Sequence, residues 1–179
     1  EVVDENLIRI AATGAYSNKI DKDISKQGYV YKEVLKTGEF KAITEPGLDS
    51  ICRSCIKRGK CEELFEMSTP IILQGRIIGV IGLVCFNKDQ KNFMMERLED
   101  YKAFMEQISE FISTAAYENI QKKKEDVIVK SLNLIIDKIE QGVMILNKEN
   151  KLTHINSRGI EIIKHVNNFS SAKVLIEST

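Results

Sequence analysis

Three cysteines stand close together in the sequence, and a fourth follows further along the chain. Cys52, Cys55 and Cys61 form a C-x2-C-x5-C pattern, and Cys85 lies 24 positions after Cys61. Two thiolates separated by two residues can bind one metal ion, because the turn between them points both sulfurs inward. The pattern therefore predicts a metal site made by Cys52, Cys55, Cys61 and Cys85, with zinc or an iron–sulfur cluster as the bound group.

Two other interpretations of the cysteines stay open. The spacing matches no standard zinc finger or ferredoxin pattern, and Cys85 lies in an apolar segment, where cysteine behaves as a small hydrophobic residue. The cluster is therefore also compatible with a redox-sensitive thiol switch, or with cysteines that have no chemical role. Basic residues lie among the cysteines, and we expect their charge to lower the pKa of the thiols: Arg53, Lys57, Arg58 and Lys60.

The histidines argue against catalysis. His154 and His165 are the only two histidines, and both lie far from the cysteines in the sequence. A catalytic thiol needs a base or an orienting partner nearby, so we predict that the chain is not an enzyme. A thiol-based redox enzyme is the alternative. A histidine kinase would need a phosphoacceptor histidine in the helical region 88–140, which has none.

The composition is that of an ordinary globular protein without net charge. The chain has 179 residues, of which 43% are hydrophobic, and its 26 basic residues balance 26 acidic ones. This balance argues against a surface that contacts nucleic acid directly. No apolar segment approaches the ~20 residues that span a membrane, and no signal segment is visible. We therefore expect a cytoplasmic protein, in which cysteines stay reduced.

The sequence predicts an α+β fold, with an antiparallel sheet and flanking helices. Alternating and apolar segments indicate strands at 2–3, 7–12, 40–44, 64–73 and 77–86, and a short helix covers 28–36. The segment 77–86 is apolar on both faces, which is typical of a strand in the middle of a sheet. From residue 88 the periodicity becomes helical, with Asn87 as the predicted N-cap and Gln90 as its partner.

A long helix is predicted to connect two parts of the chain. It covers about fifty residues, or forms two helices with a joint at 121–126. An apolar stripe recurs every three or four residues, and we expect it to hold a homodimer together: Leu98, Tyr101, Met105, Ile108, Ile112 and Ala115. The alternative is that this face packs on the sheet of the same chain.

The segment after this helix returns to a strand pattern. Strands are predicted at 143–146 and 152–155, then a helix from 156 and a further strand at 173–176. The predicted domains are 1–117, a linker helix 118–141, and 142–179. A lone hairpin is marginally stable in water, so we expect 142–179 to be poorly ordered or to borrow a partner.

Two stretches resemble known sensory families. The sequence VLKTGEF at 34–40, with TPIILQGRIIGVIGLVCF at 69–86, resembles the GAF fold, whose central strand contains glycine. The sequence GVMILNKENKLTHINSRGIEII at 142–163 resembles the opening hairpin and first helix of a PAS domain, in which an asparagine caps the helix. Only the start of such a domain is present in the sequence. The resemblance therefore implies a GAF-like sheet, a long connecting helix and a partial PAS-like segment.

Together, the cysteine cluster, the GAF-like strands and the PAS-like start resemble the sensory region of sigma-54-dependent transcriptional activators. The family implies a region that senses a small molecule or a redox or metal state and relays it through the long helix. In that family an ATP-hydrolysing domain and a helix-turn-helix follow, and through them the protein reaches sigma-54 RNA polymerase and DNA. No phosphate-binding G-x-x-x-x-G-K-[ST] sequence occurs here. We therefore expect the chain to be part of a larger protein. A structural dimerisation module is the remaining alternative.

Overall fold

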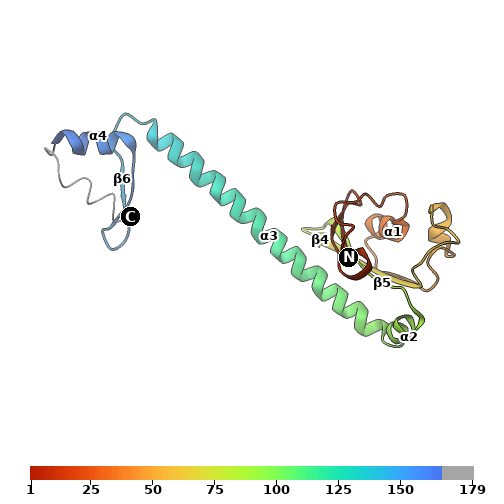
Figure 1. Cartoon of the computed structure of the whole chain (residues 1–179). Coiled ribbons are helices and arrows are strands. Elements are labelled where there is room, and N and C mark those ends of the chain that lie inside the picture. Colours follow the sequence, from red (N-terminus) through yellow and green to blue (C-terminus); the bar gives the residue numbers. More distant parts are fainter. Residues whose placement is uncertain (167–179) are drawn as a thin grey trace. The chain divides into compact units, whose positions relative to one another are not determined.

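A computed structural model describes residues 1–166 of the chain (Figure 1). The chain divides into two compact units, one over residues 1–118 and one that begins at residue 119. The long helix α3 (Leu98–Asp137) contributes residues to both units. The predicted strand at 173–176 lies outside the described residues. Within residues 1–166, no helix combines the length and the apolar character that are needed to cross a membrane.

The first unit is built on a five-stranded antiparallel sheet. Its strands stand in the order β2-β1-β5-β4-β3. Their bounds are Val2–Asp4 for β1, Arg9–Ala11 for β2, Lys41–Ile43 for β3, Phe65–Leu73 for β4 and Arg76–Cys85 for β5. The two long strands form a hairpin whose turn residues, Gln74 and Gly75, both have positive φ angles. The predicted antiparallel sheet with flanking helices is confirmed, and β5 is its central strand.

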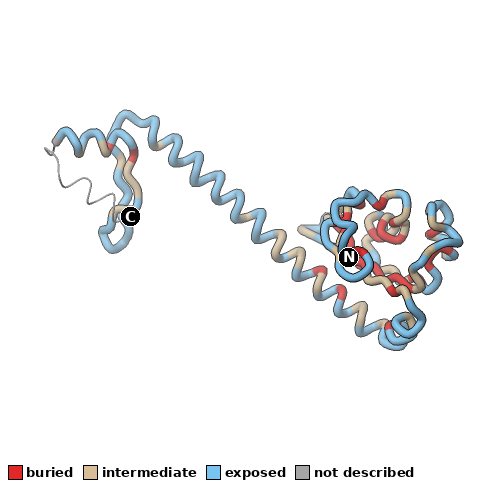
Figure 2. The backbone as a smooth tube through the Cα atoms, in the orientation of Figure 1, coloured by how far each residue is buried: buried red, intermediate tan, exposed pale blue. Residues whose placement is uncertain are grey.

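Helices cover both faces of this sheet. On one face, α2 (Lys88–Glu96) and the first part of α3 cover an apolar core that includes Phe65, Met67 and Met105. On the other face, α1 (Tyr29–Thr37) packs over a second core that includes Val34 and Val80. In Figure 2 the buried residues of this unit gather on the sheet and on α1. Because neighbouring strand residues point to opposite faces, one hairpin supplies both cores.

The start of α2 and the end of α1 follow the capping signals in the sequence. The side chain of Asn87 accepts a hydrogen bond from the backbone N–H of Gln90 at 2.8 Å, which confirms the predicted N-cap of α2. Gly38 ends α1 in the left-handed conformation at φ 70°, where a residue without Cβ is favoured. These caps fix where the chain leaves each helix for the sheet.

The apolar stripe predicted as a dimer seam packs on the sheet instead. Met105 is buried in the core of the α3 face, and Leu98, Tyr101, Ile108 and Ile112 pack against that core. The alternative interpretation, in which this stripe packs on the sheet of the same chain, is therefore correct. A charged side chain in place of Ile108 would disrupt this core, so a substitution at this position cannot test whether the chain forms a dimer.

Two serines fix α3 to strand β4. Strand β3 pairs only with residues 66–68 of β4, so the edge at 69–73 has no strand partner on that side. The Ser109 hydroxyl donates to the carbonyl of Pro70 at 2.5 Å, and the Ser113 hydroxyl donates to the carbonyl of Ile72. These bonds occupy acceptors that an exposed edge would otherwise offer to another chain.

Of the two predicted arrangements of the helical region, the one with a joint at 121–126 is wrong. The helical region breaks at Arg97, which leaves the helical conformation at φ −124° and ψ 34°, and α3 then runs unbroken for 40 residues. The break lets Met94 of α2 and Leu98 of α3 both turn to the same core. The polar run at 121–126 has no sheet beneath it and stays helical, because lysine and glutamate are good helix formers.

The second unit contains the rest of α3, a hairpin and a short helix. Strand β6 (Met144–Leu146) pairs with β7 (Leu152–Ile155), and α4 (Ser157–Val166) follows directly. Met144, Ile145 and Leu146 are all exposed, so both faces of β6 lack a cover among the described residues. This exposure agrees with the expectation that the hairpin needs further strands.

Two glycines let other chain segments approach β5 closely. A Cβ on Gly79 would lie 2.4 Å from the carbonyl oxygen of Val3 in β1. A Cβ on Gly82 would lie 2.1 Å from the hydroxyl oxygen of Tyr31 and 2.5 Å from its ring. The ring of Tyr31 therefore rests on the bare backbone of Gly82, which explains a glycine in the middle of a buried strand.

We predict that Gly82→Ala lowers the free energy of unfolding by about 1–3 kcal/mol, because the new methyl group overlaps the Tyr31 ring. Urea denaturation of the purified chain measures the change. In a Tyr31→Ala background the same substitution should cost much less, since the overlapping ring is gone. Equal costs in the two backgrounds would contradict the close packing of Tyr31 on Gly82.

Candidate functional site

The three clustered cysteines lie on the loop between β3 and β4. A short 3-10 helix, η2 (Ser50–Ser54), carries Cys52, which is buried, while Cys55 and Cys61 are half-buried. Cys85 is buried at the end of β5. All four cysteines are free thiols.

Hydrogen bonds give this loop its shape. The Asp49 side chain accepts from the backbone N–H of Ile51 at 2.9 Å, and Gly59 N–H donates to the carbonyl of Gly47 at 3.1 Å. The thiol of Cys55 donates to the carbonyl of Gln27 at 3.5 Å and accepts from Lys57 N–H at 3.4 Å. These bonds hold the loop through its own backbone and side chains.

Three of the predicted ligands lie on one loop, and the fourth lies in the core. Cys55 acts on the pKa of the Cys52 thiol through its charge, and Cys52 acts in the same way on Cys61. The backbone of Gly47 also lies close to Cys61, since a Cβ on Gly47 would lie 2.7 Å from the Cβ of Cys61. The thiol of Cys85 instead contacts the sulfur of Met94 at 2.8 Å in the core. Cys85 thus packs in the core, and its place in the predicted ligand set stays a prediction.

No metal geometry is formed by these side chains as they stand. Within residues 1–166, no three side chains among His, Cys, Asp and Glu are grouped to hold a metal ion. A site of Cys52, Cys55 and Cys61 stays a prediction, and it would require their side chains to turn toward one point.

The expected lowering of the thiol pKa values is wrong. Burial raises the pKa of Cys52, Cys61 and Cys85, and that of Cys61 rises to about 11. Lys57 and the backbone N–H of Glu63 act in the opposite direction on Cys61, but the loss of water outweighs them. The other basic residues of the loop, Arg53, Arg58 and Lys60, point into solvent, where their charge is screened.

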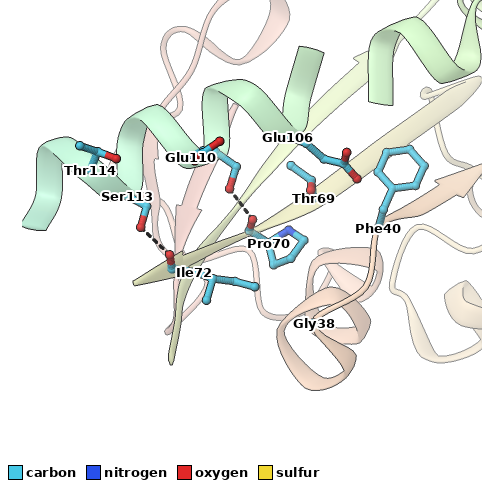
Figure 3. A pocket seen from close by; sticks show the side chains of 10 residues that line it. Gly38, Phe40, Thr69, Pro70, Ile72, Glu106, Glu110, Ser113 and Thr114 are labelled. Atoms are coloured by element: carbon cyan, nitrogen blue, oxygen red, sulfur yellow. Dashed lines mark hydrogen bonds between the residues drawn. The ribbon is translucent and has the colours of Figure 1, made fainter. Parts of the chain in front are cut away.

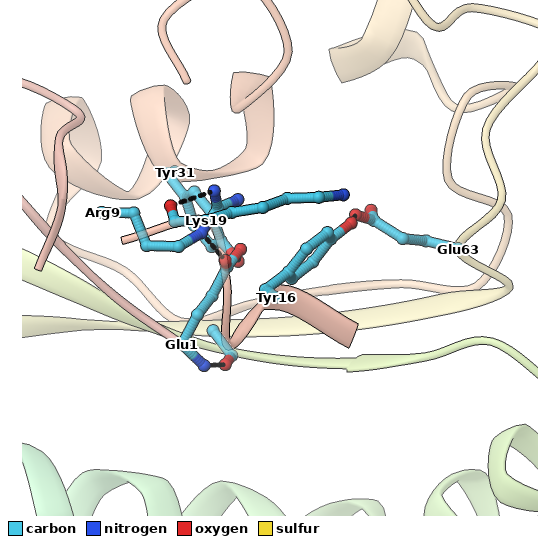
Figure 4. A network of polar contacts seen from close by, with 7 residues as sticks. Glu1, Arg9, Tyr16, Lys19, Tyr31 and Glu63 are labelled. Carbon is cyan, nitrogen blue, oxygen red and sulfur yellow. Dashed lines mark hydrogen bonds and ion pairs between the residues drawn. The ribbon is translucent and has the colours of Figure 1, made fainter. Parts of the chain in front are cut away.

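A buried network of polar side chains covers the α1 face of the sheet (Figure 4). The Tyr31 hydroxyl donates to Glu1 at 2.5 Å, and Arg9 forms an ion pair with the same carboxylate. Arg9 also donates to the carbonyl of Lys19 at 3.1 Å, and its guanidinium lies 4.6 Å from the ring centre of Tyr16. Arg9 is 4% exposed, so these partners replace almost all of its water.

Two further polar residues of β4 lie on this face. Glu66 is 6% exposed and accepts a hydrogen bond from the Ser68 hydroxyl at 3.1 Å. Burial raises the pKa of Glu66 well above its ordinary value of 4.5, and the nearby carboxylate of Glu63 adds to this effect. Burial also raises the pKa of Tyr31, followed by the charges of Glu66 and Glu1. We refer to the following residues as the polar site: Glu1, Arg9, Tyr16, Tyr31, Glu63, Glu66 and Ser68.

Carboxyl groups outnumber cations in the polar site. Glu1, Glu63 and Glu66 all act on the hydroxyl of Tyr31, and Arg9 is the buried cation that faces them. Neighbouring carboxylates repel each other where little water is present. Glu66 is therefore the carboxyl group of the polar site that binds a proton most readily. A protonated carboxyl group can both donate and accept a hydrogen bond.

Glu63 joins the cysteine loop to the polar site. One of its carboxylate oxygens accepts from the Tyr16 hydroxyl, and the other accepts from the Cys61 thiol at 3.7 Å. Burial raises the pKa of the Cys52 thiol, and the charge of Glu66 adds to this effect. The thiols and the polar site are therefore parts of one region.

Sequence reasoning missed the polar site. Tyr31 lies in the predicted helix 28–36 and Arg9 in the predicted strand 7–12, but neither pattern indicated a functional residue. A signal existed in FEMSTP at 65–70, because a glutamate and a serine at 66 and 68 share one face of an otherwise apolar strand. The buried ion pair of Arg9 with Glu1 depends on the pairing of β1 with β2, which residue types alone do not fix.

Two pockets open on this unit. One of about 280 Å³ lies beside the loop and is lined by Cys61, Glu63 and Lys91, with Pro46 and Leu48 among the apolar residues. It gives solvent access to the thiol and carboxylate that link the two parts of the region. The other, of about 400 Å³, lies between β4 and α3 and is lined by Glu106 and Glu110 on the helix and by Phe40 and Thr69 on the sheet side (Figure 3).

The histidines lie elsewhere. Both His154 and His165 belong to the second unit, whereas the four cysteines belong to the first. The Nε2 atom of His154 is buried without a hydrogen-bond partner. Within the described residues, no thiol is paired with a histidine, which a nucleophilic cysteine commonly uses.

The comparisons with known proteins identify the kind of protein that the chain resembles. No family model matches the chain. UacR of Escherichia coli (strain K12), described as a uric acid sigma-54-dependent transcriptional regulator, is 30% identical over 168 residues, which are 94% of this chain. The similarity confirms the predicted resemblance to sigma-54-dependent regulators. The chain spans 28% of the length of that relative.

A solved structure also matches the chain. It is the complex of DhaR(N) with DhaL from E. coli, which is 13% identical, with a TM-score of 0.49, over 91% of this chain and 55% of the matched chain. This similarity is too low to support a conclusion about the fold or about partners. The assignment of the sheet to the GAF fold and of the hairpin to a PAS domain stays a prediction.

We predict that Glu66→Gln stabilises the chain at pH 8 and has little effect near pH 4.5. The pKa of Glu66 is raised in the folded state, so its contribution to stability is complete below the unfolded value of 4.5 and is lost as the pH rises. The neutral amide avoids this loss, and the gain over the wild type grows by up to about 1.4 kcal/mol per pH unit. Urea denaturation between pH 4.5 and 8 measures it.

The matched control is Glu62→Gln, because Glu62 is an exposed carboxylate of the same region. A stability difference between Glu66→Gln and the wild type that stays constant across the pH range would contradict a buried, proton-binding Glu66.

Proposed function

We propose that the chain is the signal-sensing region of a sigma-54-dependent transcription regulator that works in the cytoplasm. The observation that carries the proposal is the 30% identity with UacR over 94% of the chain. Since the chain spans 28% of that relative, the output functions belong to regions outside it. By the family resemblance these are an ATP-hydrolysing domain and a helix-turn-helix, which reach sigma-54 RNA polymerase and DNA.

The polar site and the cysteine loop are the proposed point where the signal enters. Support comes from convergent polar groups under a loop, with a pocket of about 280 Å³ at Cys61 and Glu63. A small molecule is one class of signal. The name of the relative makes uric acid the first compound to test, since the carboxylate of Glu63 in this pocket can accept from its N–H groups and the ammonium of Lys91 can donate to its oxygens.

A metal or redox signal is the second class. The closeness of Cys52 to Cys55 and Cys61 supports it. Zinc or an iron–sulfur cluster bound by these thiolates would supply local order to the loop and displace the thiol protons. A reversible disulfide within the loop is the metal-free version of the same signal.

A catalytic role has less support. The relative is described as a regulator, and burial leaves the thiols of Cys52 and Cys61 protonated at neutral pH. A thiol-based reductase would need a thiolate and a base. We therefore propose that the region senses and does not catalyse.

Helix α3 is the proposed relay, and its exposed face is the proposed homodimer contact. In place of the 98–115 stripe, apolar residues recur at intervals of seven on the exposed part of α3: Ile120, Val127 and Leu134, with Ile128 and Ile135. An interval of seven residues is the heptad repeat of coiled coils. Val127 and Ile128 are 63% and 59% exposed, a cost that pairing with a second copy would remove.

We predict that a chimaera of the E. coli relative, in which residues 1–179 replace the matching region, activates a sigma-54-dependent promoter in response to a signal. Reporter expression is compared with and without uric acid, zinc and oxidant. Cys61→Ser and Tyr31→Phe should change the response, because they alter the loop and the polar site. Cys85→Ser should not, since Cys85 lies in the core.

Metal analysis of the anaerobically purified chain separates the two classes of signal. Zinc or iron that disappears in Cys52→Ser and Cys61→Ser but not in Cys85→Ser supports the metal site. A reporter that stays constant under every signal would contradict the sensory function.

We predict that the chain is a dimer at micromolar concentration and that Ile128→Glu with Ile135→Glu makes it monomeric without unfolding the sheet. Analytical ultracentrifugation measures the mass. Lys122→Glu with Asn133→Glu adds the same residues on the opposite side of the helix and should leave the dimer intact. A wild-type monomer would rule out this seam.

A further inference from the structure

One asparagine ties together four parts of the second unit. Asn156 is fully buried between β7 and α4. Its Oδ1 atom accepts from the N–H groups of Val143 and Gly159, each at 2.8 Å. Its Nδ2 group donates to the carbonyls of Ile136 at 2.9 Å and Gln141 at 3.0 Å. An asparagine side chain has two donors and two acceptor positions, and all are used here.

Through these bonds Asn156 caps two helices at once. Gly159 is the third residue of α4, so Asn156 is the N-cap of that helix. Ile136 lies in the last turn of α3, where carbonyls lack partners within the helix. The end of one helix and the start of the next are therefore held by a single side chain.

Asp137, the last residue of α3, makes a second link between the same helices. Its carboxylate accepts from the backbone N–H of Ser157 at 3.0 Å and from the Ser157 hydroxyl at 3.2 Å. A carboxylate is unfavourable at the C-terminus of a helix and favourable at an N-terminus. Asp137 thus weakens the end of α3 taken alone and stabilises α4, so its place is explained only when both helices are joined.

Two glycines allow the backbones to meet at this point. A Cβ on Gly142, in the turn before β6, would lie 3.0 Å from the Cα of Gly159. A Cβ on Gly159 would lie 3.0 Å from the Oδ1 of Asn156. The start of α4 therefore rests directly on the backbone that follows α3.

We infer that Asn156 and Asp137 form a coupling joint, which makes the order of the β6–β7 hairpin and α4 depend on the last turn of α3. If that turn unwinds or rotates, the carbonyl of Ile136 and the carboxylate of Asp137 leave their partners. The Nδ2 group of Asn156 then loses one of its two acceptors inside the buried joint. The two caps of α4, from Asn156 and from Asp137, are weakened together. The use of this joint in signalling rests on the proposed function of α3 as a relay, but the joint itself does not.

Amide hydrogen exchange of the whole chain tests the joint. Asn156→Ala should speed exchange at 142–146 and 157–160 at least tenfold, while residues of the sheet in the first unit keep their rates. Because loss of a buried amide can unfold the hairpin outright, Asp137→Ala is the second variant: it improves helix propensity in α3 yet should also speed exchange at 157–160. Asn133→Ala and Asp126→Ala, at exposed positions of α3, are the matched controls.

The reverse experiment perturbs α3 and observes the hairpin. Asn133→Gly weakens the end of α3 at an exposed position outside the proposed dimer contact, and it should speed exchange at 142–146 at least tenfold. Asp126→Gly carries a similar helix cost two turns earlier and should leave the hairpin protected. Unchanged hairpin exchange in Asn133→Gly, or equal changes in both variants, would overturn the joint. A silent promoter reporter with intact exchange coupling would count against the proposed function and not against the joint.

Discussion

Along the paired strands β4 and β5, successive side chains must point to opposite faces of the sheet, and this constraint organises the first unit. Phe65, Met67 and Ile81 turn to the face that α3 covers, whereas Glu66, Ser68 and Gly82 turn to the face of α1. Alternate residues of this nine-residue strand, β4, thus contribute to an apolar core on one face of the sheet and to the polar site on the other. A shift of one residue in register would exchange the two faces, so the polar site is fixed by the same pairing that fixes the core.

Helix α3 is shaped by two different requirements along its length. Up to about residue 115 one apolar face of the helix packs on the sheet of the first unit, and Ser109 bonds to the strand edge beneath. Among the described residues beyond that point, the apolar side chains from Ile120 to Ile135 are largely exposed. Local propensity explains why the helix continues through 121–126, and burial explains why its surface changes character. An isolated helix of this composition gains little from propensity alone, so the exposed part needs a packing partner.

The regular elements could be predicted from the sequence because each depends on local signals. The strands 64–73 and 77–86, the N-cap at Asn87 and the helix of the relay follow from periodicity and capping residues. The direction in which the helix faces could not be read in this way, since a stripe that fits a partner helix fits a sheet equally well. The thiol pKa values were predicted with the wrong sign because neighbours in sequence were counted and water was not. The basic residues of the loop point outward, and burial governs Cys52 and Cys61.

Glu63 shows why a loop without a core of its own can still influence the sheet. Its carboxylate is shared between the hydroxyl of Tyr16 and the thiol of Cys61, so neither partner can leave without changing the bonding of the other. Any event that removes the S–H donor of Cys61, whether metal binding or oxidation, would leave the carboxylate with Tyr16 alone and close to Glu66. In a space with little water, such a change is not screened and must be met by a movement of the loop, of Tyr16 or of a proton. The chemistry of a half-buried thiol is thereby connected to the face of the sheet opposite α3. The strand that carries Glu66 on this face, β4, packs its alternate residues against α3 on the other face.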